Sequence, residues 1–289
     1  MKQNQMSELK TETIYYLGPN GSYTHRAMLE FIKDYSIKSE KQEALNAIKS
    51  IISAVDSDKN SLGVIPIENS IEGIVRESID NLIRVEDIGV KIIGEVVLDV
   101  NHCLLSKSND KSTIKTVISH PQALAQCSSY LDANFSNLHI LEERSTSAAA
   151  KRVSEKDETY AAIANEIAAD FFSLNVLDKS INDEKDNKTR FILIGRAETY
   201  ISDDDKTSLA FSTQNTAGAL FKVLDVFNRH DINLLYIDSR PSKKNLGEYT
   251  FFIDFEGHEK DQNIESALVE ILPLTGFYRC NGSFAVYKK

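Results

Sequence analysis

The chain has 289 residues, of which 42% are hydrophobic and 26% charged, and its formal net charge is -10. This composition excludes a collagenous or wholly disordered chain, and the acid excess without clustered Lys and Arg argues against a nucleic-acid partner. The chain has no run of about 18 apolar residues, and its polar N-terminus lacks the apolar segment of an export signal. We therefore expect a cytoplasmic protein with no membrane partner.

The three cysteines, Cys103, Cys127 and Cys280, are far apart in the sequence. Their spacing matches neither a metal site nor a disulfide framework, so it predicts free thiols in a reducing compartment.

Residues 14–196 alternate short β-branched or aromatic runs with helical patterns, which predicts βα units that build mostly parallel sheets. In the helical stretches, apolar residues recur at three- and four-residue spacing. The expected strands are 14–17, 62–66, 90–100, 116–119, 138–142, 160–164 and 190–195, and the expected helices are 23–34, 44–55, 74–83, 122–133, 146–153 and 165–172.

Residues 196–206 lose apolar periodicity and contain three consecutive Asp residues, which predicts a solvated linker. The pattern after it predicts a β-α-β-β-α-β order, the ferredoxin-like arrangement. The polar residues 242–247 predict a hairpin turn. The expected elements are strand 207–212, helix 217–229, strands 232–238 and 248–255, helix 263–272 and strand 276–286.

The connection after the first strand contains Gly18 and Gly21 and leads into a helix. Thr24 lies near the helix start, where free backbone N–H groups attract an anion. An ordinary capped connection explains the same residues, and His25 suits either an acid–base role or a structural one.

Asn69 and Ser70 follow a buried strand, at the end where ligands bind in α/β sheets, so they are candidate hydrogen-bond donors. Glu68 and Glu72 beside them equally suit the acids favoured at a helix N-terminus.

Ser119 precedes a helix whose first turn contains a proline, and helix capping explains this serine well. Capping does not explain Gln122 and Gln126, which lie one helical turn apart and can point their amides into a common cleft.

Thr189 and Arg190 stand at the start of an apolar strand. The planar guanidinium of Arg190 suits a substrate carboxylate, and an ion pair with the acids of residues 182–186 fits it equally well. In the C-terminal part, the helix beginning at Gly218 and the strand ending at residues 238–241 can meet at a subunit interface and hold an amino acid, or can serve as ordinary connections.

Taken in order, the segments Gly18-Pro19-x-Gly21, residues 66–70, residues 119–126 and residues 189–191, followed by residues 218–220 and 238–241, resemble the prephenate dehydratase family. The resemblance implies an α/β fold with a bilobal catalytic domain similar to type II periplasmic binding proteins, and a ferredoxin-like ACT domain. The implied boundaries are 14–197 for the catalytic domain, with lobes of about 14–97 plus 178–197 and 98–177, and 206–289 for the ACT domain.

The resemblance implies a lyase that decarboxylates and dehydrates prephenate to phenylpyruvate, without a metal or redox cofactor. It further implies the effector L-phenylalanine and a homodimer or homotetramer that assembles through its ACT and catalytic domains. A chorismate mutase module is not expected, because only about a dozen polar residues precede the first strand, too few for its long helices.

By the same resemblance, Thr189 is the catalytic residue. The implied substrate-binding residues are Thr24, Asn69, Ser70, Ser119, Gln126, Arg190 and Phe191, and the implied effector-binding residues are Asn215, Gly218, Ala219, Leu220, Asp238, Ser239, Arg240 and Pro241. Asp238 stands where the family usually has Glu. The motifs do not separate prephenate from arogenate dehydratase, and a non-catalytic metabolite sensor is the alternative from another class.

Overall fold

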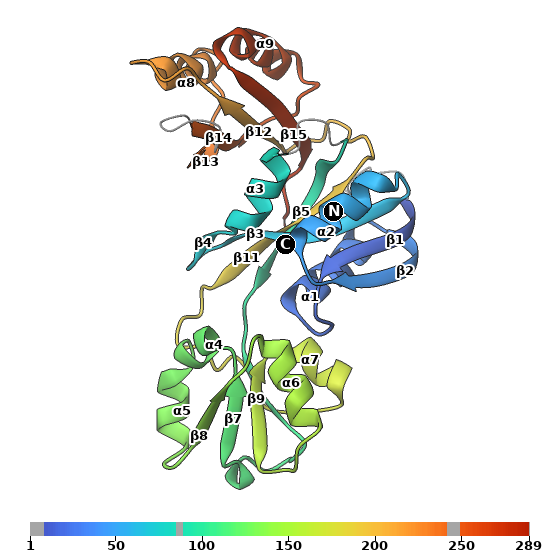
Figure 1. Ribbon diagram of the computed structural model, residues 1–289, viewed down its shortest axis with the longest axis vertical. Helices are drawn as coiled ribbons and strands as arrows, with labels where there is room; N and C mark the ends of the chain where they lie inside the picture. Colours follow the sequence, from blue (N-terminus) through green and yellow to red (C-terminus); the bar gives the residue numbers. More distant parts are fainter. Residues whose placement is uncertain (1–8, 85–88, 242–248, 289) are drawn as a thin grey trace.

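The computed structural model describes residues 9–84, 89–241 and 249–288. These residues form three sheets, and Figure 1 shows the first sheet in the middle of an elongated molecule, with the second below it and the third above. Among the described residues, no helix is long and apolar enough to cross a membrane. The predicted α/β class is confirmed, because helices and strands alternate along most of the chain.

The first sheet contains strands β1 (Lys10–Leu17), β2 (Lys38–Leu45), β3 (Ser61–Asn69), β4 (Gly73–Ile74), β5 (Lys91–Asp99) and β11 (Lys188–Gly195). The order is β2-β1-β3-β11-β5, and β4 pairs with β3. Strands β2, β1 and β3 are parallel, whereas β11 is antiparallel to both neighbours. Helix α1 (Tyr23–Asp34) packs on one face, and α2 (Ile48–Ser57) and α3 (Arg76–Arg84) pack on the other. We call this sheet with its helices the first lobe.

The second lobe is built on strands β6 (Cys103–Ser106), β7 (Thr116–Ser119), β8 (His139–Glu142), β9 (Tyr160–Ala164) and β10 (Asn175–Asp178), in the order β10-β6-β9-β7-β8. Strands β8, β7 and β9 are parallel. One face is covered by α6 (Thr146–Ser154) and α7 (Glu166–Phe172), and the other by α4 (Pro121–Ala125) and α5 (Ser128–Asn134). A short 3-10 turn (Lys111–Thr113) precedes β7.

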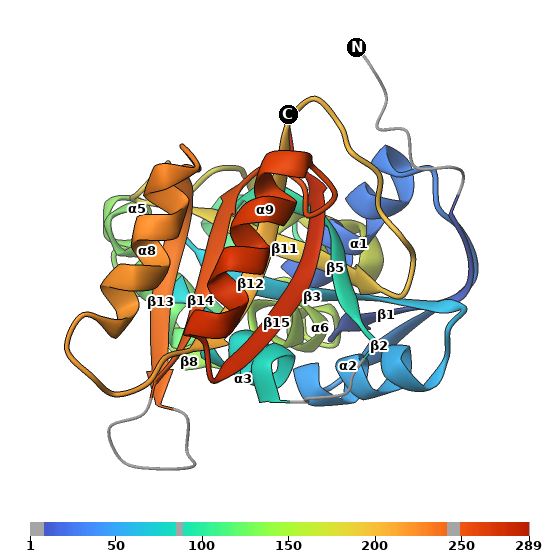
Figure 2. The ribbon, with the colours of Figure 1, turned by 90° about the horizontal axis from the view of Figure 1, so that it is seen from above.

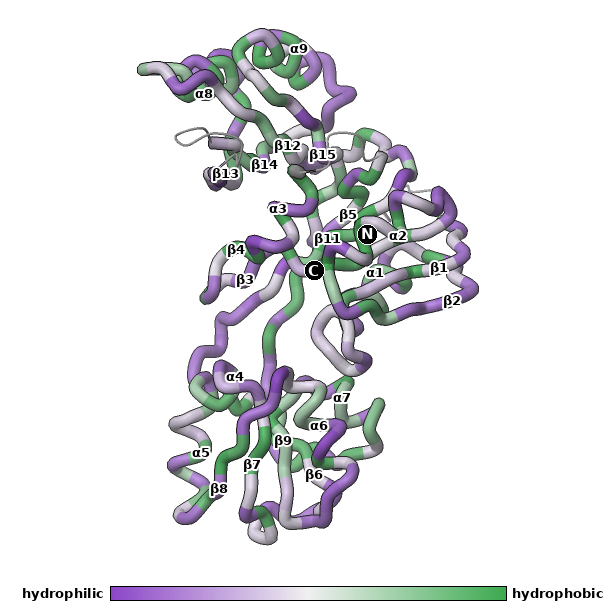
Figure 3. Tube along the Cα trace, viewed as in Figure 1, coloured by the Kyte–Doolittle hydropathy of each residue, from purple (hydrophilic) through white to green (hydrophobic). Residues whose placement is uncertain are grey.

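The chain crosses between the two lobes twice, once at residues 100–102 and once at residues 179–187. Figure 3 shows the second crossing in the hydrophilic colour, which fits its sequence of mostly Asp, Glu, Lys and Asn. Each crossing segment joins a strand of one lobe directly to a strand of the other lobe.

The third sheet contains β12 (Asp205–Ser212), β13 (Leu234–Pro241), β14 (Tyr249–Glu256) and β15 (Phe277–Ala285), in the order β13-β14-β12-β15. Figure 2 shows that α8 (Ala219–Arg229) and α9 (Gln262–Ile271) cover one face of this sheet. A 3-10 turn (Leu272–Leu274) follows α9. The predicted β-α-β-β-α-β order is therefore confirmed. The predicted hairpin turn at 242–247 lies outside the described residues.

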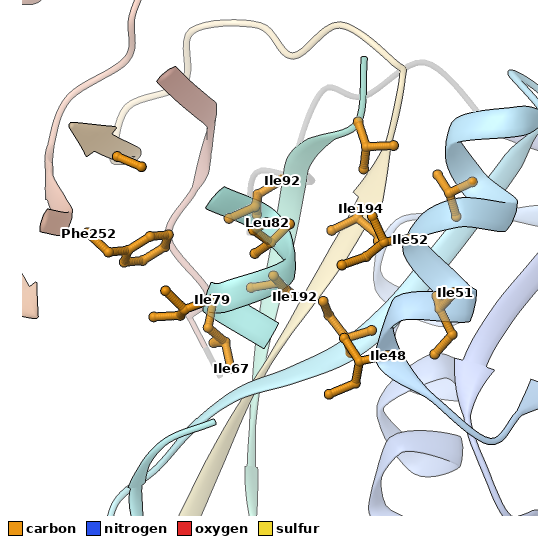
Figure 4. Close-up of a cluster of buried hydrophobic side chains, with 14 of the residues drawn as sticks. Ile48, Ile51, Ile52, Ile67, Ile79, Leu82, Ile92, Ile192, Ile194 and Phe252 are labelled. Carbon is orange, nitrogen blue, oxygen red and sulfur yellow. The ribbon is translucent and has the colours of Figure 1, made fainter. Parts of the chain in front are cut away.

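The other face of the third sheet packs against the first lobe. Phe252 of β14 joins Ile67 of β3 and Ile79 of α3 in one buried cluster (Figure 4). Gly282 of β15 lies so close to β5 that a Cβ atom there would stand 2.3 Å from the carbonyl oxygen of Ile92. The C-terminal domain thus rests directly on strands that also build the first lobe.

Some predicted elements were wrong in detail. Residues 44–45 belong to the edge strand β2 rather than to a helix, which begins only at Ile48. The sequence did not predict β2, because this strand is mostly exposed and polar and carries no apolar pattern. The helix expected at 122–133 is two helices, since the carbonyl of Gln126 accepts a hydrogen bond from the N–H of Asp183 at 2.7 Å. The sheets are mixed rather than mostly parallel, because β6, β10 and β11 run against their neighbours.

Candidate active site

A pocket of about 330 Å³ lies between the two lobes. The first lobe contributes Asn69 at the end of β3 and Thr189 at the start of β11, and the second lobe contributes side chains that follow β7 and β8. Both crossing segments also reach it, through His102 and Asn187. The pocket is therefore formed at strand ends, where α/β sheets commonly bind ligands.

The side chains of Asn69 and Thr189 meet in this pocket because their strands pair in that register. The Asn69 amide donates to the Thr189 hydroxyl oxygen at 2.8 Å. Its orientation is fixed by the backbone N–H groups of Ile71 and Glu72, which both donate to the Asn69 side-chain oxygen at 3.0 Å. Among the described residues, none accepts a hydrogen bond from the Thr189 hydroxyl, so its proton is available to a ligand.

Gln126 approaches the same pocket from the second lobe. Its side-chain oxygen lies 3.1 Å from Nε2 of His102, and this oxygen can only accept, so Nε2 carries a proton. Burial lowers the pKa of His102, although the hydrogen bond to Gln126 acts in the opposite direction. A neutral His102 therefore holds the Gln126 oxygen and leaves its NH2 group to donate into the pocket.

Arg144, Ser145 and Thr146 line the pocket at the N-terminus of α6. Ser145 caps this helix by accepting from the N–H of Ala148 at 3.1 Å, and the first backbone N–H groups of a helix have no partner within it. No described carboxylate pairs with the Arg144 guanidinium, and no Asp or Glu is among the described residues that line the pocket. A chain of net charge -10 thus presents a pocket suited to an anion.

Thr189, Asn69 and Gln126 are the predicted site residues that the structure brings together in the pocket, along with Gln122. Two predicted substrate-binding serines, Ser70 and Ser119, form hydrogen bonds with backbone groups instead. The Ser70 hydroxyl accepts from the N–H of Lys188 at 2.9 Å, and the fully buried Ser119 hydroxyl donates to the Ile163 carbonyl at 2.7 Å.

Thr24 and Phe191 do not line the pocket either. Thr24 is buried on α1, and Phe191 is buried in the apolar cluster between α1 and the first sheet. Thr189 and Phe191 lie on the same face of β11, because side chains alternate along a strand. Phe191 is further into the strand than Thr189, so it packs in the core below the pocket.

The structure differs from the prediction that Arg190 reaches a substrate carboxylate. Its guanidinium lies on the opposite face of β11 from the pocket, with Nε 2.7 Å from Glu95 and Nη1 2.6 Å from Asp254. The alternative prediction, that Arg190 forms an ion pair, is confirmed. Its partners are Glu95 and Asp254, however, and not the predicted acids of residues 182–186. Burial opposes the charged form, yet Asp254 and Glu95 outweigh it and raise the pKa of Arg190.

The connection after β1 spans the two lobes rather than entering the pocket. Asn165 of the second lobe donates to the Gly21 carbonyl at 2.8 Å, and Gly21 has a φ of +75°, which favours glycine. His25 accepts from the Gly21 N–H at 3.0 Å and stacks on Tyr16 with ring centroids 5.1 Å apart. Of the two readings of His25, this placement matches the structural one.

Sequence reasoning missed Arg144, His102 and Asn187. Arg144 follows the carboxyl end of β8, next to the parallel strand β7. The rule that singled out Asn69, a polar residue directly after a strand end, applies to this position as well and could have found Arg144. His102 and Asn187 sit on the crossing segments, which have no periodic pattern to indicate that they face a cleft.

The C-terminal domain has a second pocket, of about 370 Å³, beside the N-terminus of α8. Four predicted effector residues, Asn215, Gly218, Ala219 and Leu220, line it together with Tyr249 and Phe251.

The other four predicted effector residues are on the edge strand β13. Ser239 and Pro241 pair with the pocket-lining residues Phe251 and Tyr249, whereas Asp238 and Arg240 form an ion pair of 2.8 Å on the other face of the sheet. The structure thus brings Asn215, Gly218, Ala219 and Leu220 into one pocket and leaves Asp238 and Arg240 outside it.

The fold and the site define a class of protein, namely a two-lobed α/β protein with an acid-free pocket between its lobes and a C-terminal β-α-β-β-α-β domain. Residues 14–199 match the family model for prephenate dehydratase, and residues 207–273 match the model for the ACT domain. The chain therefore belongs to the prephenate dehydratase family.

Individual relatives are similar in sequence to this chain over nearly its whole length. A prephenate dehydratase from Methanocaldococcus jannaschii is 42% identical over 280 residues, which cover 96% of this chain and 99% of the relative. A bifunctional chorismate mutase/prephenate dehydratase from Aquifex aeolicus is 38% identical over 94% of this chain and 73% of the relative.

Among solved structures, prephenate dehydratase from Arthrobacter aurescens in complex with L-Phe superposes with a TM-score of 0.84 at 31% identity, covering 95% of this chain and 90% of that one. The prephenate dehydratase from Staphylococcus aureus superposes with a TM-score of 0.78 at 28% identity, over 94% of this chain and 99% of that one.

Proposed function

We propose that this chain converts prephenate to phenylpyruvate, carbon dioxide and water, with no metal or redox cofactor. The observation that carries the proposal is the Thr189 hydroxyl. Its oxygen accepts from Asn69, so its proton is left for a ligand, in a pocket that no described acid lines.

The reaction requires a proton donor near the leaving group and binding sites for two carboxylates. When the ring carboxylate leaves as carbon dioxide, its electron pair enters the ring, and the hydroxyl on the opposite ring carbon leaves as water after it gains one proton. Thr189 donates a hydrogen bond to that leaving oxygen and relays to it one proton that the solvent supplies, so the Thr189 hydroxyl is unchanged after the step. Aromatisation of the ring drives the step, so the protein has to position and protonate rather than supply electrons.

The carboxylates of prephenate are held from the second lobe. Arg144 offers a planar pair of donors, the N-terminus of α6 offers free backbone N–H groups, and Gln126 offers its amide. Arg190 has no part in this contact, because its guanidinium is bonded to Glu95 and Asp254.

The acid-free pocket favours prephenate over arogenate as substrate. Arogenate carries an ammonium group where prephenate has a keto group, and a buried ammonium group needs an acidic partner. The described lining contains none. Arginine and helix N–H groups in the same place would repel the ammonium group and attract a second carboxylate.

Purified protein mixed with prephenate tests the proposal through the ultraviolet absorbance of phenylpyruvate in alkali. Turnover of prephenate well above that of arogenate is the expected result. Faster turnover of arogenate would mean that arogenate, not prephenate, is the substrate. Binding of prephenate without turnover of either compound would favour the non-catalytic sensor.

We propose that L-phenylalanine binds the C-terminal pocket and inhibits the enzyme. The free N–H groups at the start of α8 suit its carboxylate, and Phe251 and Tyr249 suit its ring. Calorimetry tests binding. Gly218→Val adds a side chain at a φ of +77° beside the pocket and is expected to abolish both binding and inhibition. Unchanged inhibition would refute this effector site.

We propose that the chain forms a homodimer or homotetramer, with one contact through β13. This strand is at an edge of the third sheet, and its apolar residues Leu235 and Ile237 are 43% and 47% exposed. A second copy would cover them and bring Ser239 and Pro241 of one copy close to the effector pocket. Light scattering with and without Leu235→Glu tests this contact, and a monomeric wild-type protein would refute it.

We propose boundaries of 14–197 for the catalytic domain and 206–289 for the regulatory domain, with lobes of about 14–97 plus 178–197 and 98–177. The absence of helix or strand between Gly195 and Asp205 supports the first division, and the two crossing segments support the second. A cytoplasmic location is also proposed, because all three cysteines are free thiols, as predicted.

A further inference from the structure

Arg190 is adjacent to Thr189 on β11, but the two side chains lie on opposite faces of the strand. Because side chains alternate along a strand, Thr189 points to the pocket and Arg190 points to the C-terminal domain. The Arg190 side chain is only 12% exposed, and it bonds Glu95 of β5 and Asp254 of β14. The residue beside the catalytic hydroxyl is therefore bonded directly to the regulatory domain.

Four charged side chains meet at this contact, two of them buried and two mostly buried, and we call them the interdomain charge cluster: Arg190 and Glu95 from the first lobe, Lys206 and Asp254 from the C-terminal domain. Lys206 lies 3.0 Å from the second oxygen of Glu95, so each side contributes one acid and one base. The charges of these four side chains cancel, and Glu95 and Asp254 are only 2% and 1% exposed, whereas the more distant Glu68, 3.8 Å from Arg190, is 37% exposed. Removing one member leaves its buried partners unbalanced, which is costly.

Asp254 is also close to the effector pocket along its own strand. β14 begins with Tyr249 and Phe251, which line that pocket, and reaches Asp254 three residues after Phe251. The other oxygen of Asp254 accepts a hydrogen bond from Ser208 on the neighbouring strand β12, which holds the carboxylate in place. One strand thus joins the effector pocket to Arg190, as β11 joins Arg190 to Thr189.

We propose that Arg190 is a positioning residue and not a substrate ligand: through Asp254 it ties the strand that carries Thr189 to the C-terminal domain, and phenylalanine binding there shifts Thr189. An effector acts only if it favours one of two states, and a bond spanning both domains differs between those states when the domains move. The inference rests on the proposed function for the identity of the substrate and effector.

Steady-state kinetics distinguish a positioning residue from a ligand. Arg190→Gln is expected to lower kcat at least about tenfold and to change KM less than about twofold, because it displaces Thr189 without removing a substrate contact. Arg190→Lys keeps the charge and is expected to recover part of kcat. A KM raised about tenfold or more at a retained kcat would overturn the proposal.

Asp254→Asn tests the regulatory link without touching either pocket. The factor by which saturating phenylalanine lowers kcat/KM is expected to fall at least about fivefold. Glu259→Gln is the matched control, because Lys91 and Glu259 form another interdomain ion pair, 2.9 Å long, at the far end of β5. This control is expected to keep the wild-type factor. Equal effects of the two variants would overturn the proposal.

The double variant Arg190→Gln/Asp254→Asn restores the balance of buried charge, so it is expected to be more heat-stable than either single variant. Its response to phenylalanine is nevertheless expected to stay lost. Recovery of the response along with stability would mean that the cluster acts only through stability, which would overturn the proposal.

Amide hydrogen exchange separates failure of this inference from failure of the proposed function. If the wild-type protein does not turn over prephenate, the proposed function fails, but exchange of the β11 amides can still be compared. Asp254→Asn is expected to speed exchange at Lys188–Gly195, whereas Glu259→Gln leaves the Thr189 end unchanged. Unaltered exchange in Asp254→Asn would refute the link between Asp254 and β11.

Discussion

The side-chain amide of Asn69 donates a 2.8 Å hydrogen bond to the hydroxyl oxygen of Thr189, across two paired strands of the first sheet. This bond sets the direction of the Thr189 proton, since the donor and acceptor roles of the pair are fixed by the backbone around Asn69. A neutral hydroxyl becomes a directed donor in this way.

Thr189→Val removes the hydroxyl and keeps the shape of the side chain. We expect kcat to fall by about 10²–10⁴-fold while KM stays within a few-fold, because the lost hydrogen bond acts on the leaving group. Thr189→Ser keeps the hydroxyl and is expected to retain much of kcat. Near-normal turnover by the valine variant in the phenylpyruvate assay would refute the catalytic role.

Asn69→Asp reverses the hydrogen bond without changing its length much. The new carboxylate can still accept from Ile71 and Glu72, but it accepts the Thr189 proton as well and adds negative charge to an anion site. We expect kcat to fall by about 10²-fold and KM to rise. Unchanged kcat would show that the direction of the Thr189 proton does not matter.

Arg144→Gln removes the positive charge from the lining of the pocket. We expect KM for prephenate to rise roughly 10- to 100-fold with a smaller effect on kcat, since charged hydrogen bonds contribute about 1.5–3 kcal/mol. Arg152→Gln is the control, because Arg152 is on α6, the helix that begins just after Arg144, and pairs with Glu143 outside the pocket. Equal KM values for the two variants would exclude Arg144 as a substrate ligand.

His102 is expected to make the fold sensitive to acid. Burial lowers its pKa in the folded state, so the unfolded chain takes up the proton first and stability falls as the pH drops from about 7 to about 5. His102→Asn is expected to lose part of this pH dependence of Tm. His25 and His258 also have a lowered pKa from burial, so some dependence remains. An identical pH dependence in the variant would contradict the assignment.

Gly282→Ala probes the contact between β15 and β5. A Cβ atom would lie 2.3 Å from the Ile92 carbonyl oxygen, and φ is +127°. We expect a loss of about 1–3 kcal/mol and a Tm lower by several degrees in calorimetry. Gly276→Ala is the control, since its nearest neighbour would be the Ser212 hydroxyl at an ordinary 3.4 Å. A Tm equal to wild type would mean that the two strands can separate without cost.

Much of the site could be predicted from local pattern. Asn69 and Thr189 each stand where a buried strand meets a polar turn, and Gln122 and Gln126 share one face of a short helix. Ser119 stands in the same kind of position but points into the core, where it bonds Ile163. Sequence position alone does not distinguish a side chain that enters the pocket from one that ties two strands.

The α/β class, the β-α-β-β-α-β order after residue 206 and the family could all be predicted without the structure, because periodicity and short motifs are local properties of the chain. By contrast, the positions of Arg144 at the pocket and of Arg190 beside Asp254 of the C-terminal domain follow from the fold. The partner of Arg190 lies 64 residues away in the chain, and no local pattern encodes such a pairing. The role of a charged side chain therefore depends on which groups the fold places next to it.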